Sequence, residues 1–156
     1  MRPDRIIIGE CRGGEAFDMM QAMNTGHDGS MTTCHANTPR DAFSRLETMV
    51  MMASANIPDR VIRQMLASAV NIVVQCARLN DGTRRIMSIA EVRDADDDQV
   101  FLDDIFVLER TGVNQRGRIT GQFKATGVKP RCLTRLKAYG VHLAPTIFNE
   151  QVTLKE

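Results

Sequence analysis

The sequence contains no tryptophan, only one tyrosine and no long apolar run, and its charges nearly balance. Its aliphatic stretches, such as Ile6–Ile8 and Ile72–Val74, are far shorter than the roughly 20 residues of a membrane-spanning helix, so no span is predicted. With 20 Lys and Arg against 19 Asp and Glu, the net charge is +1, which gives no indication of a nucleic-acid partner. The shortage of aromatic residues also argues against a base-stacking surface.

Cysteines are few, and none belongs to a Cys-x-x-Cys pair: they are Cys11, Cys34, Cys76 and Cys132. This spacing argues against a disulfide framework or a zinc knuckle and predicts reduced thiols in the core. The first residues lead straight into a short apolar run, not into a longer apolar stretch with a cleavage site. We therefore expect a cytosolic protein.

The first half of the chain predicts alternating strands and helices. The isoleucines of Ile6–Ile8 have the composition of a buried parallel strand. Capping residues and apolar spacing predict a strand at 5–9, a helix from 15 to a stop at Gly26, a strand at 30–34, and helices that begin after Thr38 and near Asp59. The cluster Met49, Met51 and Met52 is expected in the core.

The second half is rich in β-formers. Asn80–Gly82 is a strong hairpin signal between the predicted strands 70–78 and 84–92. Further strands are predicted at 100–109 and 118–125, followed by a helix over 130–139 that Gly140 closes. A chain of 156 residues can bury about 70% of its unfolded surface, so a real core is expected.

Charged residues follow the first strand directly. Glu10 and Arg12 lie at its carboxyl end, the edge at which open α/β sheets bind ligands. A carboxylate there can order or polarise a water for attack on phosphorus, and Arg12 can steady phosphate charge or pair with Glu10 or Glu15. Taken alone, a strand that ends in Gly-Glu is usually only the end of a strand and not a site.

Two histidines flank the second strand. His35 is predicted at the same sheet edge as Glu10, where an imidazole can donate a hydrogen bond to a γ-phosphate, and Thr33 and Asn37 add neutral donors. His27, at the opposite end, is expected at most to cap the preceding helix. A metal site built from these histidines and Cys34 would need a fourth ligand that the spacing does not supply.

These motifs resemble the Walker B segment and the His box of type II/IV secretion-system ATPases. The segments that carry the resemblance are Ile6–Ala16, Met20–Ser30, Thr32–Asn37 and Arg40–Met49. The endings Gly121–Arg131 and Arg135–Val141 resemble those of the CpaF-like ATPases of Flp/Tad pilus assembly. The resemblance covers nearly the whole chain.

The resemblance implies an α/β fold, the C-terminal part of a RecA-like P-loop NTPase core, with antiparallel hairpins and a C-terminal helix. It implies a partial ATPase core over 1–110 and an extension over 111–156. Glu10 would be the catalytic glutamate and a water-mediated Mg²⁺ contact, and His35 the His-box histidine. Arg12 and Glu15 would be Walker B neighbours.

The implied protein is a hexameric, Mg-ATP-driven motor that docks on inner-membrane platform proteins and powers pilus assembly or protein secretion. Arg45 could point across a subunit interface toward phosphate, although pairing with Asp41 or Glu47 suits it as well.

A phosphate-gripping loop is missing from the sequence. Such a loop needs Gly-Lys followed by Ser or Thr, and none of the 11 glycines precedes a lysine. We therefore expect a truncated chain that binds ATP and Mg²⁺ weakly and has no significant ATPase activity. Two alternatives are a non-catalytic oligomerisation or scaffold module of a secretion complex and a nucleic-acid motor, which would need a basic surface that the sequence does not show.

Overall fold

The structure is a computed structural model that describes residues 3–54, 56–149 and 153–154. The chain divides into two compact units, Met1–Asn71 with Val92–Leu102, and Ile72–Glu91 with Asp103–Glu156. We call them the first and the second unit. The division of the sequence near residue 110 stays a prediction.

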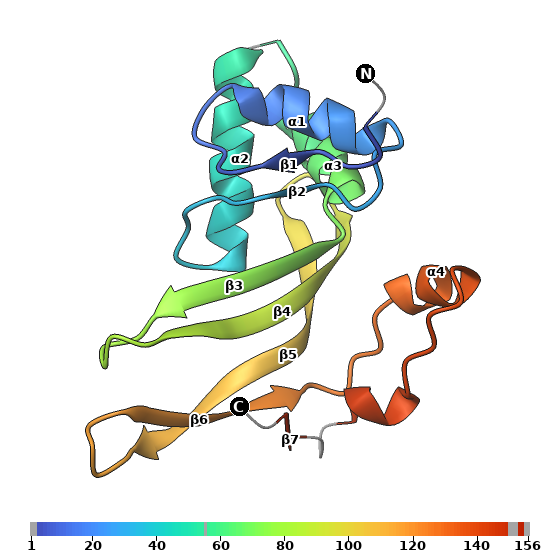
Figure 1. Cartoon of the computed structure of the whole chain (residues 1–156). Coiled ribbons are helices and arrows are strands. Elements are labelled where there is room, and N and C mark those ends of the chain that lie inside the picture. The colour runs from blue at the N-terminus through green and yellow to red at the C-terminus, as the bar shows by residue number, and fades with distance from the viewer. Residues whose placement is uncertain (1–2, 55, 150–152, 155–156) are drawn as a thin grey trace. The chain divides into compact units, whose positions relative to one another are not determined.

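The first unit combines a short parallel sheet with three helices (Figure 1). The strands are β1 (Ile7–Ile8) and β2 (Met31–Thr32), and the helices are α1 (Glu15–Asn24), α2 (Pro39–Ala53) and α3 (Asp59–Ala69). Both strands are shorter than expected, because only two residues of each pair regularly. The order strand, helix, strand, helix, helix is confirmed.

Local signals set the helix ends as predicted. Thr38 accepts a hydrogen bond from the backbone N–H of Asp41 at 3.1 Å, and Pro39 starts α2. Gly26 has φ +91° just beyond α1, a left-handed conformation that glycine adopts without strain. His27 approaches the Ala22 carbonyl through Nδ1 at 3.0 Å, which confirms its expected place at the end of this helix.

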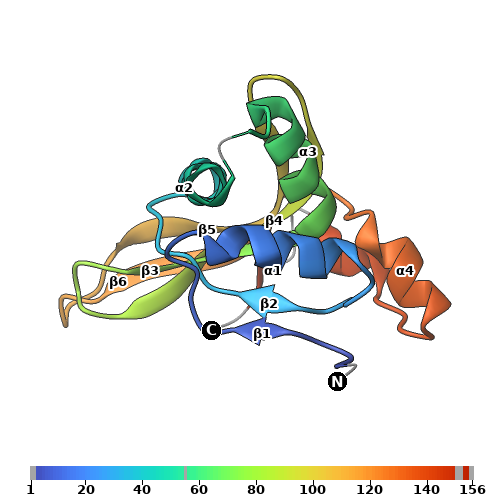
Figure 2. The ribbon, with the colours of Figure 1, turned by 90° about the horizontal axis from the view of Figure 1, so that it is seen from above.

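The three helices pack against one another around an aliphatic core, and Figure 2 looks down the axis of α2 with α1 and α3 beside it. The buried residues of this core are Cys11, Ala16, Met19, Met20, Phe43, Leu46, Met49, Val50, Ile62 and Leu66. The expected methionine cluster is only partly internal, because Met49 is buried whereas Met52 is 76% exposed. Met52 lies about one turn further along α2.

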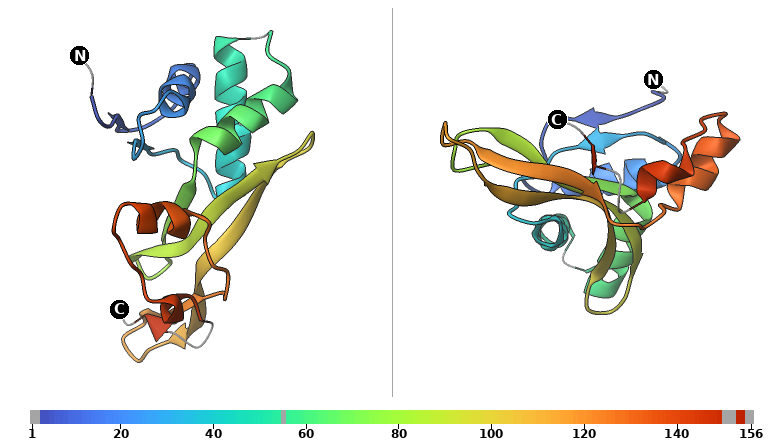
Figure 3. Two further views of the ribbon diagram at one scale, coloured as in Figure 1. Left: turned by 90° about the vertical axis from the view of Figure 1, so that its right-hand side faces the viewer. Right: turned by 90° about the horizontal axis from the view of Figure 1, so that it is seen from below.

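The second unit is built on a five-stranded sheet in the order β3-β4-β5-β6-β7, although the end of β4 and the start of β5, within Val92–Leu102, belong to the first unit. The strands are β3 (Ile72–Arg78), β4 (Arg84–Ala95), β5 (Val100–Val113), β6 (Ile119–Ala125) and β7 (Thr153–Leu154). β3 pairs antiparallel with β4, β5 with β6, and β6 with β7. The strands β4 and β5 are the longest of the sheet (Figure 3), and both extend beyond the predicted ends.

The predicted hairpin turn is present between β3 and β4. Gly82 adopts φ +82°, and Leu79 accepts from Gly82 and donates to Thr83 across the turn. Asp81 holds the turn in place, because its carboxylate accepts from the Thr83 N–H and hydroxyl and from the Ile119 N–H at 2.7 Å. These hydrogen bonds lower the pKa of Asp81 to about 2.

Helix α4 (Cys132–Ala138) is shorter than the predicted 130–139. Gly140 follows its C-terminal cap and closes the helix, as expected. Gly140 has φ +77°, and the Val141 N–H donates to the Leu136 carbonyl at 2.9 Å, which is the bond of a Schellman motif. The 3-10 helix Pro145–Phe148 was not expected. Its Phe148 is buried against Phe106, with ring centroids 5.9 Å apart.

The mixed α/β fold class expected from the sequence is confirmed. All four cysteines are free thiols, and Cys11 is buried as predicted. The prediction is wrong for Cys76, which is exposed, because alternate residues of β3 face away from the core. None of the helices in the described ranges combines the length and apolar character that a bilayer crossing needs.

Candidate functional site

The parallel pairing of β1 and β2 brings two loops to one edge of the sheet. Ile7 pairs with Met31 and Ile8 with Thr32, so both strands run in the same direction and end side by side. Beyond the strands, the Cys11 N–H donates to the Thr33 carbonyl at 2.8 Å, which keeps the two loops together. Glu10 and His35 therefore lie at the same edge, as the sequence predicts.

Glu10 is the centre of a three-residue cluster. Its Oε1 lies 2.5 Å from Nδ1 of His35, and its Oε2 lies 2.5 Å from Nη2 of Arg12. An ionised carboxylate only accepts hydrogen bonds, so Nδ1 of His35 carries the proton that it donates to Glu10. The side chain of Glu10 is 24% exposed, whereas those of Arg12 and His35 are 75% and 78% exposed. The carboxylate is thus the sheltered member of a cluster that opens to solvent.

The cluster sets the charge state of Glu10. The hydrogen bond from Arg12 is the largest cause that lowers the pKa of Glu10, and the hydrogen bond from His35 acts in the same direction against partial desolvation. Glu10 is therefore ionised at neutral pH and is a weak base. In this arrangement its carboxylate can orient a water molecule better than it can remove a proton from one.

Glu15 fixes the loop that carries Arg12. Its Oε1 accepts from the backbone N–H groups of Arg12 at 2.7 Å and of Gly13 at 3.0 Å, and these bonds lower the pKa of Glu15. Gly14, the N-cap residue of α1, has no side chain to satisfy the first turn, so the carboxylate of Glu15 binds the N–H groups that precede the helix. A Cβ at Gly14 would lie 3.2 Å from Cβ of Ala53, which favours glycine there.

The remaining predicted site residues lie near this cluster in different ways. The Thr33 hydroxyl donates to the Gly9 carbonyl at 2.6 Å, so its proton is already engaged. Asn37 is exposed just before the N-cap of α2. Arg45 is exposed on α2, and Glu47, one of its expected partners, pairs instead with Arg63 at 3.1 Å.

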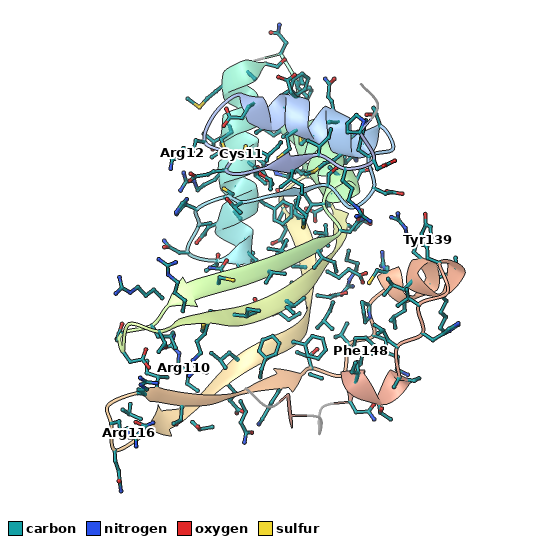
Figure 4. All side chains as sticks on the ribbon, in the orientation of Figure 1. Cys11, Arg12, Arg110, Arg116, Tyr139 and Phe148 are labelled. Atoms are coloured by element: carbon teal, nitrogen blue, oxygen red, sulfur yellow. The ribbon has the colours of Figure 1, made fainter. Side chains whose placement is uncertain are left out.

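Arg12 and Arg45 line one shallow groove of about 470 Å³ in the first unit. The other lining residues are Asp41, Ser44, Thr48, Met49 and Met52. Figure 4 places Arg12 at the outer edge of this unit and Cys11 further in. Sequence reasoning did not assign Ser44 or Thr48, although steps of three residues from Asp41 to Ser44 and of four from Ser44 to Thr48 put all three on one face of α2.

A metal site formed by side chains alone is not present in the described ranges. No group of three or more His, Cys, Asp or Glu residues there could hold a metal ion. Glu10 remains the acidic residue of this edge that could contact a metal through water.

Comparison with known proteins places the chain in a family. The sequence pattern described as "Type II/IV secretion system protein" matches residues 1–127. The chain belongs to this family. It therefore belongs with the secretion-system ATPases that the sequence motifs resemble.

Two curated relatives show the extent of the similarity. A conjugal transfer protein of Mycobacterium tuberculosis is 41% identical over 96 residues, 62% of this chain and 27% of that protein. The type IV secretion system protein VirB11 of Brucella suis is 40% identical over 91 residues, 56% of this chain and 25% of that protein. The chain thus spans about a quarter of the length of the relatives it matches.

A solved structure agrees with this assignment. The crystal structure of the VirB11 ATPase from the Brucella suis type IV secretion system, in complex with sulphate, matches with a TM-score of 0.56 and 38% identity. The match covers 58% of this chain and 28% of that one. This chain therefore has the fold of part of a secretion ATPase. The assignment of its tail to the CpaF-like branch stays a prediction.

Proposed function

We propose that the chain forms the hydrolytic side of the active site in an ATP-driven motor of a secretion, conjugation or pilus-assembly machine. The observation that carries this proposal is the contact between Glu10 and His35 at the carboxyl ends of two parallel strands. Family membership and the similarity to an ATPase support it. We propose a CpaF-like member that works as a homohexamer in the cytoplasm, on platform proteins of the inner membrane.

Glu10 is the residue that we propose for positioning the attacking water. Its carboxylate is ionised and sheltered, and His35 holds one of its oxygens in place. Phosphoryl transfer proceeds through a loose transition state, so orientation of the water matters more than its deprotonation. A carboxylate whose pKa is lowered is well suited to orientation.

The described residues fit one side of an Mg-ATP site and not the other. Glu10, Arg12 and His35 can order water and face phosphate charge, and Glu10 could contact Mg²⁺ through water. No Gly-Lys pair in the sequence can cradle a phosphate chain, and no described cluster of acidic residues holds a metal by itself. When bound, Mg-ATP supplies the phosphoryl group that water attacks. We propose that this chain alone binds ATP weakly and does not turn it over.

A chimera tests this function. The part of the Brucella suis VirB11 ATPase that corresponds to the family match of this chain is replaced with residues 1–127, and phosphate release from Mg-ATP is measured for the 156-residue chain, for VirB11 and for the chimera. We expect turnover from VirB11 and the chimera and none from the chain alone. An assembled chimera without turnover would favour a non-catalytic scaffold, and saturable turnover by the chain alone would refute its proposed inactivity.

A further inference from the structure

The groove beside Glu10 has the chemistry of an anion-binding site. Its volume of about 470 Å³ is in the range of small-ligand pockets, and it lies entirely within the first unit. Its lining residues include Arg12 and Arg45, which carry guanidinium groups, and Ser44 and Thr48, which carry hydroxyls. Guanidinium groups bind phosphate oxygens through paired N–H donors, and hydroxyls add single donors.

Arg45 supplies positive charge to the groove. Glu47 is engaged with Arg63, and within the described part of the chain Arg45 forms no ion pair. Asp41 is the acidic residue of the groove, so the lining carries two positive charges and one negative charge. The Thr48 hydroxyl donates to the Ser44 carbonyl at 2.9 Å, which leaves the Ser44 hydroxyl as the neutral donor for a ligand.

Arg12 belongs to both the groove and the Glu10 cluster. Its guanidinium pairs with Oε2 of Glu10, and Arg12 is also one of the residues that line the groove. Because the side chain of Arg12 is 75% exposed, its ion pair with Glu10 is a surface pair, which water and salt weaken. Glu15 anchors the backbone of Arg12 and leaves its side chain free to change partner.

We propose that the groove is a phosphate-binding site and that Arg12 transfers from Glu10 to the phosphate group when the groove fills. His35 then remains the partner of Glu10, so the carboxylate loses its strongest cationic neighbour only once an anion is in place. Arg12 is thus a positioning residue that couples anion binding to the state of Glu10. The consequence of this coupling for catalysis rests on the proposed function, whereas the binding site itself does not.

Calorimetric titration of the 156-residue chain with inorganic tripolyphosphate at low ionic strength tests the site. Saturable binding is expected, and Arg45→Gln and Arg12→Gln should each weaken it about tenfold. Arg40→Gln is the matched control, because Arg40 lies on the same helix but contacts Gln99 outside the groove. Absence of saturable binding, or equal loss in all three variants, would overturn the proposal.

A variant that should bind more tightly is included, because weaker binding of a variant could also result from misfolding. Asp41→Asn removes the negative charge of the groove, so tripolyphosphate should bind several-fold more tightly, and unchanged or weaker binding would count against the site. ATP is titrated in parallel. Equal affinities of ATP and tripolyphosphate would show that the groove takes the phosphate chain alone, and tighter binding of ATP would show that it takes the phosphate chain as part of a nucleotide.

The transfer of Arg12 is tested by a double-mutant cycle. Glu10→Gln releases Arg12, so it should tighten tripolyphosphate binding in the wild-type background and have little effect in the Arg12→Gln background. The same gain in both backgrounds would mean that Glu10 acts only by long-range repulsion, and would refute the transfer. This binding experiment involves no hydrolysis, so it can succeed even if the proposed ATPase function fails, and the reverse also holds.

Discussion

Glu91 is the buried charge on which the attachment of α4 depends. It is 7% exposed, and it uses both carboxylate oxygens: Oε2 accepts from the Arg131 N–H at 2.7 Å and Oε1 from the Cys132 N–H at 2.9 Å. In Glu91→Gln only one of these two atoms is still an acceptor, so one buried N–H loses its partner. A hydrogen bond to a charged group contributes about 1.5–3 kcal/mol.

The expected effect is local. If α4 opens separately from the sheet, a loss of about 1.5–3 kcal/mol raises the amide exchange rates at its start by about 10- to 150-fold. Hydrogen exchange followed by NMR measures these rates at Arg131 and Cys132. The control is Glu109→Gln, the same substitution on an exposed residue of the sheet that pairs with Lys124, and it should leave these amides unchanged.

Exchange at Arg131 and Cys132 that is the same in Glu91→Gln and in the wild type would refute this reasoning. Uniform acceleration across the whole chain would also contradict it, because the sheet would then depend on Glu91 as much as the helix does. The test separates capping of one helix from a general loss of stability.

Three further predictions concern the loop, the hairpin turn and the core. Glu15→Gln should loosen the loop of Arg12 and raise the pKa of Glu10 toward its ordinary value, and a carboxyl-carbon NMR titration that shows no change would contradict the role of this clamp. Because the pKa of Asp81 is lowered to about 2, its stabilising contribution is complete above its ordinary pKa of 3.8 and is lost as the pH falls toward 2, so urea unfolding of Asp81→Asn should show less acid dependence than that of the wild type. Leu66→Ala removes a fully buried side chain and should cost about 2–5 kcal/mol by urea unfolding of the first unit, and a loss below 1 kcal/mol would contradict its central position.

Much of the first unit could be predicted because its signals are local. The isoleucine run and the cap at Thr38 fix a strand and a helix start within a few residues. The expected burial of that strand is wrong, because Ile7 is 71% exposed. The meeting of Glu10 with His35 followed from one general rule, since parallel strands end at the same edge. The hairpin at Asn80–Gly82 followed from turn chemistry.

Features that depend on neighbours distant in sequence could not be predicted. The exposure of Met52 depends on which face of α2 the rest of the unit covers, and that of Cys76 on which face of β3 is covered. Phe148 is buried because its ring contacts Phe106 on β5, and the sequence around Phe148 does not predict this contact. The sequence did not decide whether Arg12 pairs with Glu10 or with Glu15. In the structure the side chain of Arg12 pairs with Glu10, and its backbone N–H donates to Glu15.

The most direct test of the proposed hydrolytic role is the rate of phosphate release by the VirB11 chimera with Glu10→Gln. The variant keeps the size of the side chain and the contact with His35 but loses the charge that orients water. We predict a fall of at least about 100-fold, as expected when a positioned acid–base or water-orienting group is lost, with Glu109→Gln unchanged. The loss of such a group should change the rate far more than about twofold. A rate within about twofold of that of the unmodified chimera would therefore show that Glu10 is not the hydrolytic residue.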